Sequence, residues 1–283
     1  MKYSLLPLFL FLLTQTLIAQ TTVSGKVVDE AGGPIAYAHI VIPGTTCGAL
    51  SDDDGTFDLR CDHQSVVKDS VKVSYLGYLT GTVAVSSLND ERREIVLVPA
   101  SQQLSLVSVV ESRKSKSLEY RFEPPSRRVR SWYQKDVTTT YQVATRIENR
   151  KNIVGYLEEI KFHIGRASSD QSTLRLFFYA LDETCGCPGK PLNAKDIVLG
   201  DISKNWNTVD LLPYIVDLPA TDFFVGFEWL GIRDKSDKKL DFSIGMVPYK
   251  QSGYLWEKEG GREWAVKKGL GGGRPVVRLK AIY

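Results

Sequence analysis

The sequence predicts an all-β protein of two domains. Residues 23–99 and the residues from 137 onward consist of short runs in which apolar and polar residues alternate, broken by Gly, Pro and Asp. The first region lacks the i, i+3, i+4 spacing of an amphipathic helix. The chain has 283 residues, of which 43% are hydrophobic and 24% charged, so two globular domains with buried cores are expected. These residues are too few for an N-terminal domain and an outer-membrane receptor barrel together.

The first residues have the pattern of a secretory signal peptide. Lys2 precedes an apolar run at residues 5–13, and the small residue Ala19 follows a more polar stretch. The run is shorter than the roughly 20 residues of a membrane-spanning helix. We therefore expect residues 1–19 to be cleaved and the mature chain to begin at Gln20, exported to the periplasm or the outer membrane without a transmembrane span. An uncleaved membrane anchor is the alternative.

The first domain is expected at residues 20–100, and its clearest local feature is a tight turn. Asp53, Asp54 and Gly55 fit a three-residue hairpin loop with Gly55 in the left-handed conformation. The resulting register sets Cys47 opposite Cys61, where facing Cβ atoms lie about 4.5 to 5.5 Å apart. In an oxidising compartment this predicts a Cys47–Cys61 disulfide. The alternative is two buried thiols.

Six separated pieces of this region, in order, resemble the carboxypeptidase-like regulatory domain. They are residues 23–29, 33–35, 38–40, 44–46, 51–59 and 73–78. The resemblance implies a transthyretin-like β-sandwich without a catalytic role. Similar domains lead TonB-dependent receptors of the outer membrane, and residues 104–110 are similar to the segment that joins such a domain to the receptor plug.

Residues 101–135 are predicted to be a basic linker. Two acidic residues, Glu119 and Glu123, are outnumbered there, and two prolines stand in the middle. The basic residues on which this rests are Arg113, Lys114, Lys116, Arg121, Arg127, Arg128 and Arg130. Charged linkers are usually solvated, although this one could also touch anionic lipid or polysaccharide.

Residues 136–283 are predicted to form a second β-sandwich of unassigned function. Leu174, Leu176 and Phe178 alternate with residues 175, 177 and 179, as expected of a strand with one buried face. Several pieces resemble the jelly-roll-like region of exported proteins that begin with the same regulatory domain. They are residues 144–147, 160–164, 174–176, 188–192, 206–211 and 222–229. The resemblance implies architecture and an envelope location, without an activity.

We expect no catalytic residues, no metal site and no cofactor. A metallocarboxypeptidase zinc site needs a His and a Glu in one short segment and a distant second His, but none of His39, His63 and His163 begins a His-x-x-Glu pair. Gly-x-Ser-x-Gly and the phosphate-binding Gly-x-x-x-x-Gly-Lys are also missing from the sequence. The net charge of +3 gives no reason to expect a nucleic acid partner.

Two weaker signals point to binding or structural sites. Cys185 and Cys187 are separated by one Gly, which favours a local loop disulfide or two loop thiols over a metal or redox motif. Trp229 alternates with apolar residues, as in a core strand. A set of aromatic residues could form a ligand-stacking platform if they shared an exposed face: Trp206, Tyr254, Trp256 and Trp264.

The function expected from the sequence is that of a non-catalytic, exported envelope protein acting as a structural or binding accessory. Its partner would be an envelope protein or a polysaccharide. The alternative is a carbohydrate-binding module of a surface glycan system, and a hydrolase with an unrecognised site is the third possibility. The loops at residues 185–192 and 255–273 are expected to carry the contacts, because they interrupt the strand pattern with Gly and Pro.

Overall fold

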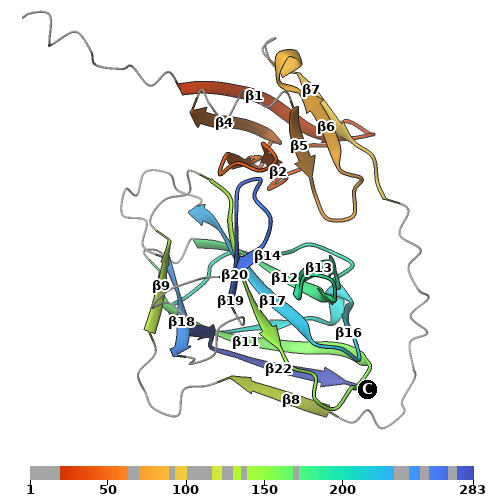
Figure 1. Ribbon diagram of the computed structural model, residues 1–283, viewed down its shortest axis with the longest axis vertical. Helices are drawn as coiled ribbons and strands as arrows, with labels where there is room; N and C mark the ends of the chain where they lie inside the picture. Colours follow the sequence, from red (N-terminus) through yellow and green to blue (C-terminus); the bar gives the residue numbers. More distant parts are fainter. Residues whose placement is uncertain are drawn as a thin grey trace, which may run out of the picture.

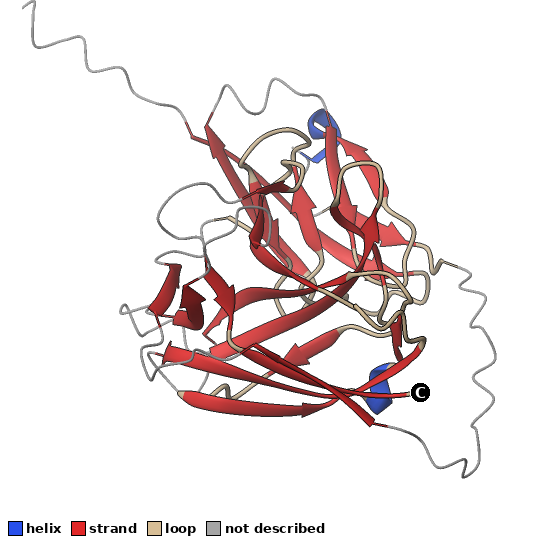
Figure 2. Ribbon diagram, turned by 60° about the horizontal axis from the view of Figure 1, so that its bottom comes forward, coloured by secondary structure: helices blue, strands red, loops and turns tan. Residues whose placement is uncertain are grey.

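The computed structural model confirms the all-β class, with two domains stacked along the long axis of the molecule (Figure 1). Within the described residues, Figure 2 shows strands throughout together with the short helical turns η3 (Val85–Leu88) and η4 (Leu212–Tyr214). The structure describes residues 20–62, 70–88, 93–100, 117–122, 130–134, 139–167, 172–232, 242–248, 255–266 and 273–283. The expected signal peptide at residues 1–19 lies outside this part.

The first domain is a sandwich of a three-stranded and a four-stranded sheet. The three-stranded sheet has the order β4 (Thr56–Asp62), β1 (Gln20–Asp29), β7 (Glu94–Leu97). The four-stranded sheet has the order β3 (Gly48–Leu50), β2 (His39–Val41), β5 (Ser70–Ser74), β6 (Gly81–Ala84). Alternate residues of each sheet, such as Val23, Val27, Ile40 and Val73, meet in one buried cluster, because side chains of a strand point to opposite faces.

The predicted turn forms, but the two-stranded hairpin around it was wrong. Gly55 has φ +82°, as predicted, and its amide donates to the carbonyl of Asp52. The strands on either side of the turn then separate, because β3 pairs with β2 whereas β4 pairs with β1. The buried hydroxyl of Ser51 replaces ladder bonds at this point: it donates to the carbonyl of Ile35 and accepts from the amide of Ala38. The chain thus crosses from one sheet of the sandwich to the other.

The second domain is a larger sandwich of two antiparallel sheets. The seven-stranded sheet contains β13 (Cys187–Pro191), β12 (Ser172–Asp182), β17 (Phe223–Ile232), β10 (Tyr141–Ile147), β19 (Leu255–Glu259) and β20 (Ala265–Val266), with β14 (Ile197–Leu199) beside β12. The eight-stranded sheet contains β21 (Gly273–Pro275), β18 (Phe242–Pro248), β11 (Gly155–Ala167), β22 (Val277–Ile282) and β8 (Ser117–Phe122), with β9 (Arg130–Gln134), β15 (Asn205–Asp210) and β16 (Val216–Leu218) attached.

The core between these two sheets follows the predicted alternation. Leu174, Leu176 and Phe178 on β12 are fully buried in it, as is Trp229 on β17 at 2% exposure. The opposite face of β12 carries Arg175, which is also buried, at 2%. The side of this sheet that faces away from its own core is therefore covered as well, and the first domain covers it.

The predicted basic linker was wrong for two stretches inside residues 101–135. Strand β8 pairs with β22 along its whole length, and β9 pairs with β18, so both belong to the second domain. The alternation of Leu118, Tyr120 and Phe122 with charged residues was the overlooked signal. Abundant basic residues are compatible with a strand at a sheet edge, where one face meets water. In the part of the chain that the structure describes, helices long and apolar enough to cross a membrane are absent.

Candidate ligand cleft between the two domains

Two turns, one from each domain, meet backbone to backbone. The amide of Gly44 donates to the carbonyl of Gly261 over 2.7 Å, and the amide of Gly261 donates to the carbonyl of Thr45 over 3.0 Å. Close by, the hydroxyl of Thr139 donates to the carbonyl of Thr46 over 2.6 Å. These bonds fix the turn after β19 against the turn between β2 and β3.

This close approach depends on two glycines. A Cβ atom at Gly261 would overlap the carbonyl group of Ile42, and one at Gly260 would overlap that of Thr46. Gly260 also has φ +54°, a left-handed conformation that glycine adopts without steric cost. The sequence Gly260-Gly261 is thus part of the domain interface and not merely of a flexible loop.

A network of buried charges joins the domains a short distance away. The Nε2 atom of His39 on β2 lies 2.8 Å from Oε1 of Glu228 on β17. Glu228 also accepts from Nη1 of Arg175 over 3.0 Å, and Nη2 of Arg175 contacts Asp196 over 3.0 Å. The same guanidinium donates to the backbone carbonyl of Tyr37 in the first domain over 2.6 Å. Arg175 therefore binds both domains at once.

The neighbours of Glu228 favour its ionised form. Burial by itself would raise the pKa of Glu228, but contacts with His39 and Arg175 and hydrogen bonds outweigh it and hold that pKa below its usual range. An ionised Glu228 only accepts, so Nε2 of His39 carries the hydrogen between them. Arg175, Glu228 and Asp196 together carry one net negative charge.

The side-chain amide of Gln142 is consistent with a hydrogen on Nε2 of His39. Its Nε2 lies 3.4 Å from Oε1 of Glu228 and 2.9 Å from Nε2 of His39. With a hydrogen on Nε2 of His39, the amide donates to the carboxylate and makes no hydrogen bond to the ring. Glu228, fully buried, then has three donors around it, which offsets the cost of burying its charge.

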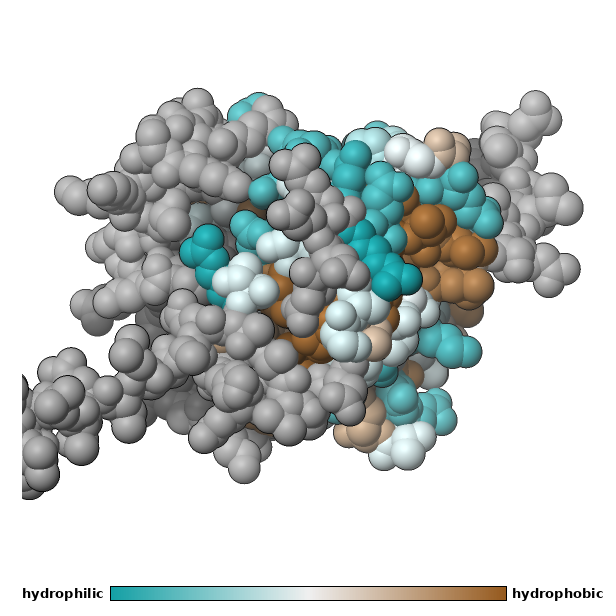
Figure 3. Space-filling view, turned by 90° about the horizontal axis from the view of Figure 1, so that it is seen from above, coloured by the Kyte–Doolittle hydropathy of each residue, from teal (hydrophilic) through white to brown (hydrophobic). Residues whose placement is uncertain are grey.

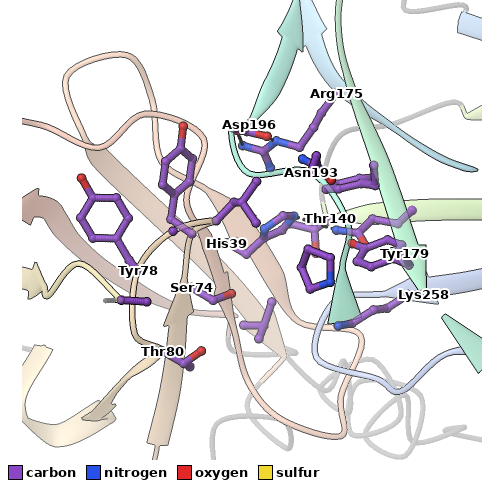
Figure 4. Close-up of a pocket in the computed structure, with 18 of the residues that line it drawn as sticks. His39, Ser74, Tyr78, Thr80, Thr140, Arg175, Tyr179, Asn193, Asp196 and Lys258 are labelled. Atoms are coloured by element: carbon purple, nitrogen blue, oxygen red, sulfur yellow. Dashed lines mark hydrogen bonds and ion pairs between the residues drawn. The ribbon is translucent and has the colours of Figure 1, made fainter. Parts of the chain in front are cut away.

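Above this network the two domains enclose a cleft of about 360 Å³ (Figure 4). Ser74, Tyr78 and Thr80 of the first domain line one side, and Thr140, Tyr179 and Lys258 of the second domain line the other, with His39 between them. The remaining lining comes from residues 41, 75–77, 100, 142, 175, 177, 191, 193, 196 and 260.

Aromatic rings form much of the cleft wall. Phe177 and Tyr179, two positions apart on β12, have ring centroids 5.6 Å apart and planes inclined by 22°. Tyr75 and Tyr78 line the cleft from the first domain, with ring centroids 5.8 Å apart. The guanidinium of Arg175 lies 5.8 Å from the ring of Tyr75 and 5.9 Å from that of Phe177. Burial, and then Asp196, raises the pKa of Tyr75 to about 12, so its hydroxyl is neutral at ordinary pH.

The polar groups of the cleft fall into two sets. His39, Arg175 and Asp196 are committed to the buried network, and Asn193 to the backbone at residues 178 and 195. The second set consists of Lys258 and the hydroxyls of Ser74, Thr80 and Thr140. Lys258 is half-buried on β19, and its ammonium group forms no ion pair or hydrogen bond with another described residue. This second set is available to a ligand.

The aromatic residues considered for a stacking platform do not all share one face. Trp206, 40% exposed, lies on β15 of the eight-stranded sheet, where Arg278 stacks over its ring at 4.6 Å. Trp256 belongs to the opposite sheet and packs edge-on against Phe224. Because the core separates the two sheets, one ligand cannot reach both faces.

Of the other two aromatic residues, one contacts a residue that lines the cleft. Trp264 packs edge-on against Tyr179 of the cleft wall, with ring centroids 5.8 Å apart. Tyr254 lies outside the described residues. The two predicted loops do contribute, because Pro191, Lys258 and Gly260 line the cleft.

The four cysteines lie in the predicted pairs. Cys47 and Cys61 are bridged, with Cα atoms 5.7 Å apart, and this bridge links the two sheets of the first domain. Cys185 and Cys187 are bridged across Gly186, whose φ is +66°. Asp182 lies beside this second bridge, but sulfur atoms in a disulfide are not thiolate ligands for a metal.

The buried network escaped sequence reasoning, although one signal for it was present. On β17, Phe223, Val225 and Phe227 point to the core, so Phe224 and Glu228 point away from it. A large apolar residue and a carboxylate on the outward face indicate a strand covered on both sides. The sequence does not say what covers it.

Comparisons with known proteins show what the first domain is similar to. Residues 23–110 match the CarboxypepD_reg-like domain, so the first domain is a member of that family. TonB-dependent receptor SusC of Bacteroides thetaiotaomicron is 38% identical over 69 residues, which are 24% of this chain and 6% of the receptor. The family match includes residues 101–110, which belong to the predicted linker.

Two solved structures of a clostridial surface protein also match at low similarity. One contains the cysteine protease and lectin-like domains of Cwp84 from Clostridium difficile, with 7% identity and a TM-score of 0.40 over 86% of this chain and 50% of that one. The other is a variant of the clostridial cysteine protease Cwp84 after propeptide cleavage, with 8% identity and a TM-score of 0.43 over 86% of this chain and 56% of that one. Similarity at this level defines neither fold nor function.

Proposed function

We propose that this protein is a non-catalytic binding accessory of the cell envelope whose binding site is the cleft between its two domains. The observation that carries the proposal is the composition of the cleft, to which both domains contribute. It combines aromatic walls, the hydroxyls of Ser74, Thr80 and Thr140, and the ammonium group of Lys258, which has no partner among the residues that the structure describes. Concave sites that combine apolar walls with a few convergent polar groups are the usual form of ligand pockets.

The cleft is suited to binding because its two walls are held in place. Arg175 bonds to both domains, and the Gly261 turn adds two backbone hydrogen bonds across the boundary. A site whose walls are fixed before binding loses less conformational entropy when the ligand enters. In this proposal the first domain has a structural role and completes the binding site of the second domain.

An envelope location is supported by two features. The first domain belongs to the CarboxypepD_reg-like family, and a TonB-dependent receptor is among the proteins with similar sequence. The N-terminal residues have the signal-peptide pattern described above. We propose export to the periplasm or outer membrane, with a polysaccharide or an envelope protein as partner.

The proposed location has a direct test. The full chain, tagged at its C-terminus, would be produced in a diderm bacterium and fractionated. We expect the protein in the envelope fraction with Gln20 as its first residue. Recovery from the cytoplasm with Met1 intact would contradict export.

The proposed role of the cleft is tested by filling it. The double variant Ser74→Trp, Thr80→Trp places bulk inside the cleft, whereas Lys151→Trp adds the same side chain at an exposed position. Both would be incubated with the soluble polysaccharide fraction of cell envelopes, alongside wild type, and bound material would be quantified. Loss of binding in the cleft variant alone is expected. Equal binding by all three proteins would contradict a binding role for the cleft.

A hydrolase is the candidate that competes with a binding role. Ser74 on β5 is the cross-strand neighbour of His39, which contacts the buried carboxylate of Glu228. A nucleophile needs a hydrogen bond to its base, of about 2.6 to 3.2 Å, and the hydroxyl of Ser74 forms none with His39 in the described residues. Ester, peptide and glycoside substrates would be assayed with wild type and Ser74→Ala. Turnover that disappears in Ser74→Ala would overturn the non-catalytic assignment.

A further inference from the structure

We infer that the cleft recognises a short acidic saccharide, with Lys258 as the partner of the acidic group. This inference rests on the proposed role of the cleft as the binding site. It assigns to each set of lining residues one part of the ligand: the aromatic wall to the sugar ring, the hydroxyls to the ring hydroxyls and the ammonium group to a carboxylate.

The aromatic wall fits a ligand with an apolar face and a polar edge. Phe177 and Tyr179 present nearly parallel rings on one strand, and Tyr78 lies across the cleft from them. A pyranose ring has C–H groups on its faces and hydroxyls around its edge, so it can pack on aromatic side chains while keeping its edge available for hydrogen bonds. A purely apolar ligand would leave the polar lining unpaired, which is costly.

The hydroxyl groups fit the polar edge of a sugar. Ser74 and Thr80 lie on one side of the cleft and Thr140 on the other (Figure 4). Each can donate one hydrogen bond and accept others, as sugar hydroxyls also do. Such groups can therefore pair in either direction around a ring, which a surface built only of charged groups cannot do.

Lys258 supplies the charge selectivity. His39, Arg175 and Asp196 already have hydrogen-bond or ion-pair partners within the buried network that includes Glu228. Lys258 is the lining cation that remains, and it is half-buried, so its attraction for an anion is screened less than at an open surface. A single ammonium group suits one carboxylate, whereas a nucleoside triphosphate would bring several negative charges.

The size of the cleft limits the ligand. A volume of about 360 Å³ is at the lower end of the range of about 300 to 1,000 Å³ for small-molecule sites. A short saccharide or the end of a longer chain fits this space, while a protein surface does not enter it. Figure 3 shows hydrophobic residues gathered on one side of the face seen from above. Leu79, Val96 and Val98 of the first domain are exposed and do not line the cleft.

The test measures binding of matched acidic and neutral saccharides by calorimetry at pH 7. The probes are trimers of galacturonate, glucuronate and mannuronate and, for each, the neutral hexose trimer of the same linkage. The proteins are residues 20–283 with the wild-type sequence, Lys258→Met, which keeps the apolar stem, and the matched control Lys204→Met, which removes an exposed lysine outside the cleft. Thermal unfolding of each protein checks that it is folded.

We expect at least one acidic trimer to bind the wild-type protein more tightly than its neutral counterpart. Lys258→Met should weaken that binding by tenfold or more, which corresponds to about 1.4 kcal/mol, and should leave binding of the neutral trimer unchanged. Lys204→Met should bind like wild type. Tyr78→Leu should weaken both trimers, because it removes part of the aromatic wall that meets the ring.

Three results would overturn the inference: no binding of any acidic trimer at millimolar concentration, equal affinity for acidic and neutral trimers, or no effect of Lys258→Met. Persistence of acidic-trimer binding in the cleft-filling double variant would do the same, because it would place the ligand elsewhere. The proposed function has its own test: it would be contradicted if filling the cleft left the capture of envelope polysaccharide unchanged.

Discussion

The imidazole of His39 in the first domain lies 2.8 Å from the carboxylate of Glu228, which is fully buried in the second domain. The contact crosses 189 positions of the sequence. It places a titratable pair in the boundary between two β-sandwiches, directly beneath the cleft. The stability of the two-domain arrangement should therefore depend on this pair and on the residues that hold it.

Glu228→Gln should be strongly destabilising. It leaves Arg175, 2% exposed, with Asp196 as its remaining acidic partner, and removing one member of a buried ion pair typically costs about 3 to 5 kcal/mol. The free energy of unfolding would be measured with urea. Glu158→Gln, which removes a surface partner of Lys280, is the matched control and should have little effect. An equal loss in both variants would contradict the role assigned to the network.

The stability of the protein should fall in acid through the same carboxyl group. Burial raises the pKa of Glu228, but the combined lowering by His39, Arg175 and hydrogen bonds is larger than this increase. The folded-state pKa therefore lies below the ordinary value of 4.5. A group with a depressed folded-state pKa stabilises the fold above its unfolded-state pKa, and that contribution is lost as the pH falls through the folded-state value. Asp196, Tyr75 and Tyr179 also face the network.

Urea unfolding of wild type and Glu228→Gln between pH 7 and pH 2 tests this dependence. The difference in unfolding free energy between the two proteins should shrink as the pH falls below about 4.5, the ordinary carboxyl value. A difference that stays constant down to pH 2 would show that Glu228 does not titrate as proposed.

Gly261→Ala should loosen the domain interface while leaving both cores intact. The added methyl group would overlap the carbonyl of Ile42 and disturb the hydrogen bonds that Gly261 makes with Gly44 and Thr45. Hydrogen exchange should become faster around residues 42–46 and 259–262. Gly186→Ala is the control, because its Cβ atom has open space around it and its strain is confined to a left-handed φ of +66°. Unchanged exchange at the interface in Gly261→Ala would refute this account.

Removal of the Cys47–Cys61 bridge should destabilise the first domain. The cysteines are 14 positions apart, and in the chain-entropy model a closed loop of about 15 residues contributes about 3 kcal/mol. The double variant Cys47→Ala, Cys61→Ala should lose stability of this order. Cys185→Ala, Cys187→Ala should lose less, because that bridge closes a much shorter loop. Mass spectrometry of the exported protein that found Cys47 and Cys61 as free thiols would contradict the bridge.

The fold was predictable where the signal is local. Alternation along β12 assigned Leu174, Leu176 and Phe178 to the core, and turn chemistry assigned Gly55 a left-handed conformation. Both follow from the backbone of a few neighbouring residues. The pairing of β3 and β4 with different sheets was not predictable in this way, because it depends on the buried hydroxyl of Ser51 and on strands distant in the sequence.

The sequence by itself determined the β class, the two sandwiches and the family of the first domain, because periodicity and motifs are properties of contiguous residues. Tertiary structure alone decided the cleft. His39, Arg175, Glu228 and Lys258 lie on four strands of two domains, and alternation identifies only which residues point away from a core. Whether such a face meets water or another domain depends on how the domains dock, through backbone contacts as at Gly261 and through side-chain contacts such as that of His39 with Glu228.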